Sequence, residues 1–287
     1  MAPRIVVAAP GDTLSMVDDI APSGYEIVKV APGSAECTEA LKSADYLVGF
    51  VDMLVKDSLY AGAPRLKLIQ LLSAGYDRAD LAAARKAKVP ISNNGGANSV
   101  AVSEHALLLM LAVSRKLIQQ HANVTGGRWR GNSVPKVNEL RGKTLGIIGL
   151  GTIGKKTARL AQAFGVIVHY YDVARLTEAE EDALGVRFRL LPEIISKSDI
   201  ISLHVALNPT TQHLLGAAEI ARMKPTALII NTSRGPVIDE KAMHAALAAG
   251  KIGGAGLDVF DEEPPPANNP LFTLDNVVLT AHLAGPT

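Results

Sequence analysis

Cysteine is nearly absent from this sequence, since Cys37 is the only one among 287 residues. A single thiol can form neither a disulfide framework nor a multi-thiolate metal site within the chain. This composition is typical of a protein from a reducing compartment, so we expect a cytoplasmic location. Asp77 and Asp80 lie together in a turn without further ligands, where helix capping explains them more simply than a metal does. We therefore predict no metal site.

Long apolar runs and runs of one charge sign are also missing. The longest apolar segment, residues 106–113, has less than half of the roughly 20 residues that a membrane-spanning helix needs. The short apolar segment at residues 5–9 is too brief for the hydrophobic part of a secretory signal. The formal net charge is +1, which provides no electrostatic basis for binding nucleic acid or an anionic membrane. We expect neither as a partner.

The first hundred residues do contain short apolar runs that alternate with helical stretches. A helix is predicted around Leu54–Ala61, and Gly11-Asp12 is interpreted as a turn after the first strand. Four turn-forming residues, Asn93-Asn94-Gly95-Gly96, close this part of the chain. We take them as the hinge at the end of a first domain, residues 1–97. The strands predicted here are Ile5–Ala9, Tyr46–Phe50 and Leu66–Leu72.

The remainder of the chain starts with a helix predicted over Ser99–His121, which is apolar on most of its faces. A helix of this kind is buried between domains or between subunits, so we expect a homodimer built around it. After Arg141-Gly142-Lys143, strands and helices alternate to the end. The strands are predicted at Thr144–Gly149, Ile167–Tyr171, Asp199–His204, Ala227–Asn231, Gly254–Asp258 and Val277–Thr280. The helices are predicted around Ile153–Phe164, Ala217–Met223 and Glu240–Ala249.

Continuous apolar strands that alternate with helices imply a parallel sheet covered on both faces. Because 287 residues exceed the size at which one hydrophobic core keeps growing, two domains are expected. The predicted fold class is therefore α/β. A Rossmann doubly wound parallel sheet would occupy residues 98–281, and a smaller, flavodoxin-like α/β substrate domain would occupy residues 1–97.

The first strand of the second part runs directly into the pattern G-x-G-x-x-G at Gly149, Gly151 and Gly154. In such a loop the first glycine makes the turn, the second lets a pyrophosphate approach the backbone, and the third lets helix and strand pack closely. The helix N-terminus then attracts the phosphates. The next strand ends at Asp172, whose carboxylate suits two ribose hydroxyls and repels a 2′-phosphate. This favours NAD over NADP, although Arg175 lies three residues further on.

Polar groups capable of acid–base chemistry or of anion binding follow the predicted strands. In doubly wound sheets, ligands bind beyond the carboxyl ends of the strands. Packing alone does not require so many of these groups along one edge. They are His204, Arg234, Asp258, Glu263 and His282.

Several long segments resemble the signatures of the D-isomer-specific 2-hydroxyacid dehydrogenases, from about residue 40 to the C-terminus. The resemblance implies that Arg234 binds the substrate carboxylate and keto oxygen, that His282 moves the proton, and that Glu263 pairs with His282. The matching segments are Leu72-Ser-Ala-Gly-Tyr-Asp77, Ser103-Glu-His105, Asn231-Thr-Ser-Arg234-Gly-Pro-Val-Ile-Asp-Glu240, Gly256-Leu-Asp258-Val-Phe-Asp-Glu-Glu263-Pro264 and Ala281-His282-Leu-Ala-Gly285.

The resemblance also implies how the ligands are held. Main-chain N–H groups of Ala74 and Gly75 would bind the substrate carboxylate, and Asp258 would meet the nicotinamide carboxamide. Asn98 faces substrate in some members, but a helix N-cap explains it equally well. The positions expected to bind NAD are Gly149, Gly151, Thr152, Ile153, Gly154, Asp172, Val205, Thr232, Ser233 and Asp258.

The chemistry of hydride delivery supports this reading independently. Negative charge builds on the ketone oxygen, so the reaction needs a proton donor that titrates near neutral pH and a fixed cation. Histidine supplies the donor, and the planar guanidinium of arginine suits a carboxylate. Among the other histidines, we expect His105 to be a hydrogen-bonding core residue, whereas His204 remains an alternative base.

The predicted function is NAD-dependent interconversion of a small 2-keto acid, such as glyoxylate, hydroxypyruvate or pyruvate, and its D-2-hydroxy acid. One alternative is a corepressor-like sensor that binds NADH without physiological turnover. Another is formate dehydrogenase, which usually carries glutamine where this chain has Glu263. A phosphorylated substrate is disfavoured because the segment Gln70–Ala74 has no cation, although Arg78 or a partner subunit could supply one. Residues 282–287 are expected to begin a return segment of a truncated chain that binds NAD but turns over poorly.

Overall fold

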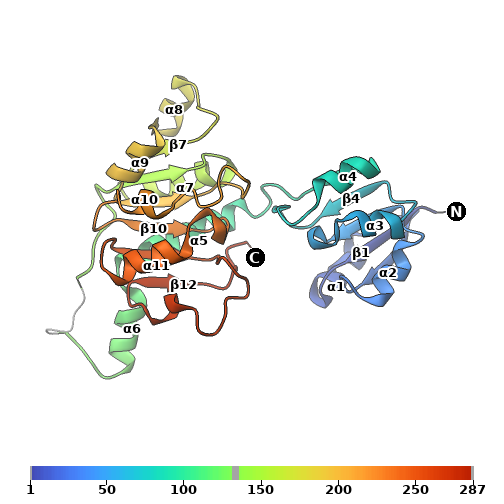
Figure 1. Ribbon diagram of the computed structural model, residues 1–287, viewed down its shortest axis with the longest axis horizontal. Coiled ribbons are helices and arrows are strands. Elements are labelled where there is room, and N and C mark those ends of the chain that lie inside the picture. The colour runs from blue at the N-terminus through green and yellow to red at the C-terminus, as the bar shows by residue number, and fades with distance from the viewer. Residues whose placement is uncertain (1, 131–135, 286–287) are drawn as a thin grey trace. The chain divides into compact units, whose positions relative to one another are not determined.

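The computed structural model describes residues 2–130 and 136–285. The chain divides into two compact units, residues 1–97 and 98–287, each with its own parallel sheet and flanking helices (Figure 1). The α/β fold class predicted from the sequence is confirmed. Among the described residues, none of the helices combines the length and the apolar character needed to cross a membrane. That part of the chain also contains no group of His, Cys, Asp or Glu side chains that could hold a metal ion.

Unit 1 is built on a five-stranded parallel sheet in the order β2-β1-β3-β4-β5. Its core consists of apolar side chains from the central strands and from the helices that cover them. The strands are β1 (Arg4–Ala8), β2 (Glu26–Val30), β3 (Tyr46–Gly49), β4 (Leu68–Leu71) and β5 (Ile91–Ser92). The helices are α1 (Gly11–Ile20), α2 (Ala35–Leu41), η1 (Asp52–Leu54), α3 (Asp57–Gly62) and α4 (Leu81–Ala87).

Three sequence predictions for unit 1 need correction. Gly11-Asp12 is not a turn but the start of α1, where an acidic residue favours a helix N-terminus. The helix predicted over Leu54–Ala61 is two short elements, η1 and α3, separated by an extended residue, Val55. Strands β2 and β5 were not predicted; both lie at sheet edges, β5 has only two residues, and Glu26 and Lys29 interrupt the apolar pattern of β2. By contrast, Asp80 caps α4 as expected.

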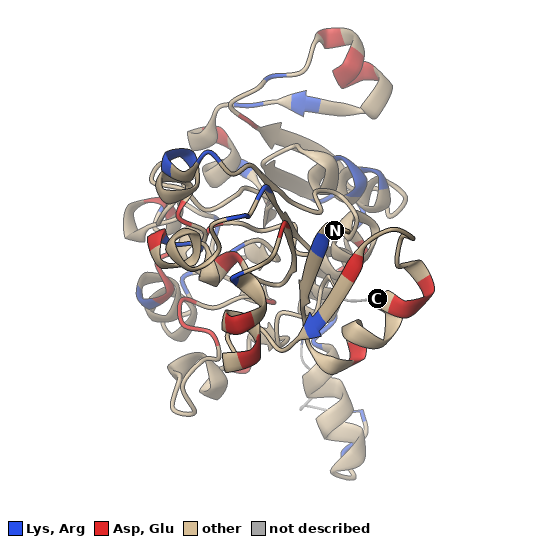
Figure 2. Ribbon diagram, turned by 90° about the vertical axis from the view of Figure 1, so that its right-hand side faces the viewer, with Lys and Arg blue, Asp and Glu red and all other residues tan. Residues whose placement is uncertain are grey.

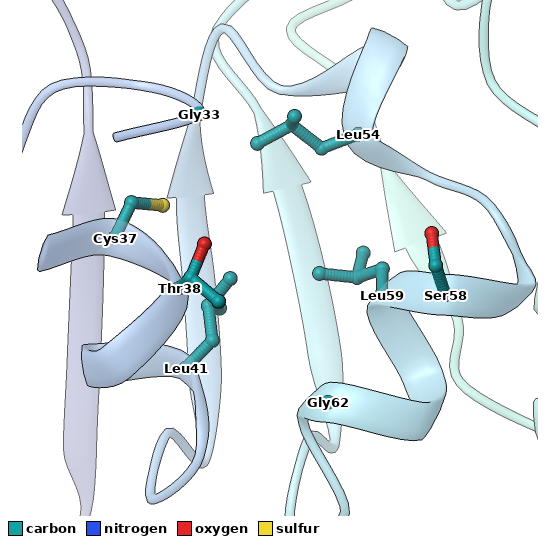
Figure 3. A pocket seen from close by; sticks show the side chains of 8 residues that line it. All are labelled: Gly33, Cys37, Thr38, Leu41, Leu54, Ser58, Leu59 and Gly62. Carbon is teal, nitrogen blue, oxygen red and sulfur yellow. The ribbon is translucent and has the colours of Figure 1, made fainter. Parts of the chain in front are cut away.

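Unit 1 contains a pocket of about 250 Å³ between α2 and α3. Figure 3 shows Cys37, Thr38 and Leu41 of α2 on one side, with Ser58 and Leu59 of α3 on the other. None of the residues predicted to bind substrate or cofactor lines this pocket.

Unit 2 is built on a seven-stranded parallel sheet in the order β12-β11-β10-β9-β6-β7-β8. The order reverses direction between β6 and β9, which is the topological switch point where doubly wound sheets bind ligands. All six strands predicted for this part are present, each within one residue at either end. Only the short edge strand β8 was not predicted. The strands are β6 (Thr144–Ile148), β7 (Ile167–Tyr171), β8 (Val186–Phe188), β9 (Ile200–Leu203), β10 (Leu228–Asn231), β11 (Gly254–Leu257) and β12 (Val277–Leu279).

Helices cover both faces of the unit 2 sheet, and a separate hydrophobic cluster fills the space on each face. One face carries α5 and α7, and the other carries α9, α10 and α11. The helices are α5 (Ser99–Ser114), α6 (Leu117–Thr125), α7 (Thr152–Gln162), α8 (Glu178–Leu184), α9 (Leu191–Lys197), α10 (Ala217–Ile220) and α11 (Glu240–Ala248), with short turns η2 (Gly235–Val237) and η3 (Pro270–Thr273).

The single helix predicted over Ser99–His121 is wrong. The backbone of Lys116 takes a left-handed conformation with φ of 52°, so α5 ends and α6 starts in a new direction. Helix α5 packs against the sheet and α7, which buries most of its apolar surface within unit 2. Helix α6 has no buried residue and extends beyond the sheet in Figure 1.

Acidic and basic residues are interspersed in the described part of the chain rather than clustered by sign. In the view of Figure 2, Lys and Arg positions are interspersed with Asp and Glu positions along the ribbon. The N-terminal turn of α8 carries three acidic residues. Many of the ionised groups form pairs with a neighbour of opposite sign, such as Lys224 with Asp199 and Arg187 with Asp182.

Candidate active site

In the glycine-rich loop between β6 and α7, two glycines lie in close contact with neighbouring backbone and the third borders open space. Gly149 has φ of +92°, and a Cβ there would lie 2.7 Å from the carbonyl oxygen of His204. A Cβ at Gly154 would overlap the carbonyl oxygen of Gly149, so this glycine lets α7 pack closely on the end of β6. A Cβ at Gly151 would meet nothing within 4 Å. The backbone at Gly151 is therefore open to a ligand.

Helix α7 starts at this opening, and no side chain caps its N-terminus. Its first-turn N–H groups, which include those of Thr152 and Ile153, have no acceptor within the helix. Backbone donors and the helix dipole together favour an anion at such a position. The loop therefore fits the pyrophosphate of a dinucleotide.

The carboxylate of Asp172 lies at the end of β7 and holds this loop. Its Oδ2 accepts a hydrogen bond from the Leu150 N–H at 2.7 Å, and its Oδ1 accepts one from the Ala174 N–H at 2.9 Å. Each carboxylate oxygen has a second lone pair, so the group can still accept from ribose hydroxyls.

Arg175 is engaged on the far side of the same loop. Its Nε donates to Glu181 Oε1 at 3.3 Å, and its guanidinium lies 5.0 Å from the centre of the Phe188 ring. Glu181 is buried, and hydrogen bonds from Tyr170 and Arg175 contribute to a lowered pKa of its carboxyl, which burial alone would raise. Because Arg175 is paired with this carboxylate, it is poorly placed to neutralise a 2′-phosphate.

Arg234 lies on the turn that follows β10, and Asn231 holds that turn. Asn231 is buried at the strand end; its Nδ2 donates to the Arg234 carbonyl at 2.9 Å, and its Oδ1 accepts from the N–H and hydroxyl of Ser233. A Cβ on the next residue, Gly235, would overlap the backbone of Phe260. The turn that carries Arg234 is thus pressed against the loop that leads to Glu263.

His282 and Glu263 form a direct pair. The imidazole Nδ1 donates to Glu263 Oε2 at 2.7 Å, while Glu263 Oε1 accepts from the Phe260 N–H at 3.1 Å. With Nδ1 bonded in this way, Nε2 is the ring nitrogen that can give or take a proton. Both side chains remain partly exposed, at 46% and 35%, so a substrate can reach them.

Asp258 is fully buried at the end of β11. Its Oδ1 accepts from the Thr280 hydroxyl at 2.6 Å and from the Leu283 N–H at 3.0 Å, and its Oδ2 accepts from the Ala284 N–H at 2.9 Å. The carboxylate therefore binds the segment that carries His282. Its predicted contact with the nicotinamide carboxamide stays a prediction.

The two histidines considered beside His282 are both committed to neighbours. His105 Nε2 lies 2.9 Å from the Thr280 hydroxyl, which agrees with its predicted role as a hydrogen-bonding core residue. His204 Nε2 lies 2.9 Å from the hydroxyl of Ser202, which is buried in β9. Burial lowers the pKa of His204 to about 4, so this imidazole is neutral near pH 7 and ill suited to donate a proton there.

The depressed pKa of His204 predicts a pH dependence of stability. The unfolded chain, in which histidine has its ordinary pKa of 6.5, binds this proton more readily than the folded chain. The contribution of neutral His204 to the free energy of unfolding is therefore complete above pH 6.5. It is lost as the pH falls from there through about 4. Urea unfolding of wild type and His204→Gln at pH 7.5 and pH 5 should show a smaller loss of stability in the variant. An equal loss in both proteins would show that His204 contributes nothing to the pH dependence.

The structure brings most of the predicted residues to one edge of the unit 2 sheet. Arg234, Asp258 and His282 follow β10, β11 and β12, which are adjacent strands. The glycine loop and Asp172 follow β6 and β7, and Val205 follows β9. The sequence analysis did not identify Asn231 and Thr280 as supporting groups. The available signal was a polar residue at the end of a buried strand.

Two further predicted residues carry buried polar atoms without a hydrogen-bond partner among the described residues, Asn98 Oδ1 and Thr232 Oγ1. Asn98 stands at the N-cap of α5, but its side chain does not cap the helix. Such atoms are costly to bury unless a ligand or water satisfies them, which fits a binding site. Ala74 and Gly75 lie in unit 1 after β4, where their carbonyls accept from Asn93 and Ser73.

The fold and this edge together define a doubly wound dinucleotide-binding unit with a histidine–carboxylate pair and an arginine beside it. The family model "D-isomer specific 2-hydroxyacid dehydrogenase, NAD binding domain" matches residues 107–284. The chain belongs to this family and is an NAD-dependent 2-hydroxyacid dehydrogenase.

The chain is similar over nearly its whole length to two glyoxylate reductases and to a D-lactate dehydrogenase of known structure. It is 41% identical over 299 residues to a glyoxylate reductase of Thermococcus litoralis, an alignment that covers 100% of this chain and 88% of the relative. It is 35% identical over 289 residues to a glyoxylate reductase of Korarchaeum cryptofilum, covering 99% and 87%. A solved structure of D-lactate dehydrogenase from Aquifex aeolicus, complexed with NAD and lactic acid, has a TM-score of 0.88 at 29% identity, covering 99% and 89%.

Proposed function

We propose that this enzyme interconverts a small, unphosphorylated 2-keto acid and its D-2-hydroxy acid, with glyoxylate, hydroxypyruvate and pyruvate as candidate keto acids. The observation that carries the proposal is the 2.7 Å bond between His282 Nδ1 and Glu263 Oε2, next to the turn of Arg234. The similarity to glyoxylate reductases and to a D-lactate dehydrogenase supports the same substrate class.

NADH, held by the glycine loop and Asp172, would supply the hydride; the residues of this chain bind the substrate, stabilise the developing charge and transfer the proton. Arg234 binds the substrate carboxylate and keto oxygen, which fixes the carbonyl and stabilises the charge that develops on its oxygen. His282 donates the proton from Nε2 to that oxygen. Glu263 holds Nδ1 and so fixes the orientation of the ring, with Nε2 free of that contact. In the oxidation direction, neutral His282 accepts the hydroxyl proton instead. The backbone N–H groups of Ala74 and Gly75 are proposed as further carboxylate ligands.

A phosphorylated substrate is disfavoured by the state of Arg78. Its Nε and Nη2 donate to the two carboxylate oxygens of Asp52 at 2.8 and 3.0 Å, and Asp52 is buried. Because Arg78 is engaged in this bidentate pair, it is poorly placed to bind the phosphate of a substrate.

Steady-state assays with NADH and a panel of keto acids test the proposal. We expect turnover of at least one of glyoxylate, hydroxypyruvate and pyruvate, and much weaker turnover of 3-phosphohydroxypyruvate. NADH binding without turnover of any of them would instead favour the corepressor-like sensor. Formate oxidation with NAD, measured in parallel, addresses the remaining alternative, which Glu263 already disfavours.

The proposed role of Asp172 predicts the cofactor preference. Asp172→Ala removes the acceptor for the ribose hydroxyls and the negative charge that opposes a 2′-phosphate. We expect weaker use of NADH and relatively better use of NADPH. The ratio of kcat/KM with NADH to kcat/KM with NADPH should therefore fall. Asp182→Ala, on the exposed side of α8, is the control for loss of one nearby carboxylate. An unchanged ratio in Asp172→Ala would contradict the assignment.

We also propose that the enzyme is a homodimer, on narrower grounds than the sequence suggested. Most apolar side chains of α5 are buried within unit 2, but Val100 and Leu108 remain about half exposed, as do Leu117, Ile118 and Val124 of α6. Exposed apolar groups concentrated on two successive helices are typical of an association surface. Analytical ultracentrifugation at micromolar concentration should give a dimeric mass, and Ile118→Asp with Val124→Asp should shift it towards the monomer. A monomeric wild type would refute the dimer.

A further inference from the structure

The segment that carries His282 is held by one buried residue. The N–H groups of His282, Leu283 and Ala284 all donate to Asp258, the first to its main-chain oxygen at 2.8 Å and the others to its carboxylate. His282 itself has φ of +54°, a left-handed conformation that is unfavourable for a non-glycine residue and persists only where the surroundings enforce it. Hydrogen bonds to Asp258 supply that enforcement.

A buried carboxylate needs donors, and Asp258 obtains one through a chain of two side chains. The Thr280 hydroxyl donates its only proton to Asp258 Oδ1 at 2.6 Å. Its oxygen can then only accept from His105 Nε2, which lies 2.9 Å away. The His105 ring must therefore carry a proton on Nε2. The same nitrogen lies 3.6 Å from Asp258 Oδ1, so the imidazole also lies beside the carboxylate.

Helix α5 provides a rigid platform for His105. A Cβ at Gly254 would lie 2.9 Å from Val113, and one at Gly256 would lie 2.8 Å from Leu109, so α5 rests directly on the backbone of β11. Four residues of α-helix rise about 6 Å, which is about the length of two residues in a strand. Moving four residues back along α5 therefore corresponds to moving two residues forward along β11. One more step from Leu109 and Gly256 pairs His105 with Asp258.

We propose that His105 and Thr280 are positioning residues that act through Asp258 to fix the backbone at His282. Glu263 restrains the imidazole through Nδ1, and the Asp258 network restrains the main chain beneath it. With both restraints in place, Nε2 has one direction in which to meet the substrate. This inference rests on the proposed role of His282, and it assigns a function to two polar residues that the reaction itself does not require.

Four variants of the full chain test the inference: Thr280→Val, which removes the hydroxyl; Thr280→Ser, which keeps it; His105→Phe, which removes the ring N–H; and the double variant Thr280→Val/His105→Phe. We expect Thr280→Val and His105→Phe each to lower kcat about tenfold or more, as displacement of a catalytic group does, with KM and the NADH dissociation constant within about twofold of wild type. Thr280→Ser should retain near-wild-type kcat. Because both residues act along one chain, the double variant should be no slower than the slower single variant. Thr273→Val, which loses a hydroxyl bonded only to the Pro270 carbonyl, is the matched control.

Hydrogen exchange at the amides of Leu283 and Ala284 provides a readout that does not depend on turnover. Both amides should exchange faster in Thr280→Val and His105→Phe than in wild type and Thr273→Val. The inference is overturned if kcat stays within about twofold in both variants, if NADH affinity falls in parallel with kcat, or if exchange is unchanged. Wild type and His282→Asn are assayed alongside. If the wild type turns over no keto acid, the proposed function fails, and the exchange rates alone decide whether the network holds the segment.

Discussion

Replacing His282 with asparagine is expected to lower kcat by about two to four orders of magnitude, the usual contribution of a positioned acid–base group. The asparagine amide can still donate to Glu263, so the local geometry survives, but it cannot transfer a proton near pH 7. Apart from Asp258, which follows β11, the residues proposed for NAD lie on the loops after β6, β7, β9 and β10. Affinity for NADH, followed by its fluorescence, should therefore change much less than kcat.

His204→Asn is the matched control, because His204 is also a histidine beyond a strand end in the same sheet. Because His204 has a pKa of about 4 and is bonded to Ser202, His204→Asn should lower kcat much less than His282→Asn does. If His204→Asn, correctly folded by circular dichroism, were as damaging as His282→Asn, the assignment of His282 as the acid–base group would be wrong.

Arg234→Gln is expected to produce the second large loss, in kcat/KM. A charged pair that loses one partner in a desolvated site costs about 2–5 kcal/mol, which corresponds to roughly thirty- to several-thousandfold. Arg234→Lys keeps the charge without the planar fork and should fall between glutamine and wild type. Steady-state kinetics over a range of keto acid concentrations separate the effect on KM from the effect on kcat.

Arg222→Gln, which removes an exposed arginine after α10, is the control for loss of one positive charge from unit 2. It should leave both constants near wild type. A keto acid KM and kcat in Arg234→Gln that match those of wild type would mean that Arg234 does not contact the substrate.

Buried strands were the most predictable part of this fold. The central strands of both units consist of consecutive apolar residues, and a parallel sheet covered on both faces requires that pattern. The edge strands β2 and β8 escaped prediction because solvent on one side permits charged residues such as Lys29 and Arg187. The end of α5 was equally hidden, since nothing in the local sequence at Lys116 signals a left-handed backbone.

The candidate site was predictable where chemistry alone restricts the residue type. Histidine, arginine and carboxylates after strand ends point to proton transfer and anion binding, and the glycine pattern points to a phosphate. The supporting network of Asp258, Thr280 and His105 was not predictable in the same way. It depends on the register between α5 and β11, two elements separated by more than a hundred residues of sequence.

The close approach at Gly235 bears on how this enzyme could be altered by laboratory evolution. Even a single methyl group at that position would force the turn of Arg234 away from the loop of Phe260 and Glu263. A library aimed at new substrates therefore has to keep glycine at 235, and saturation there would return mostly inactive clones. Diversity placed in unit 1 around Ala74 and Gly75, the proposed carboxylate ligands, leaves His282, Glu263 and Arg234 unchanged, so it would test selectivity without altering the residues proposed for the chemistry.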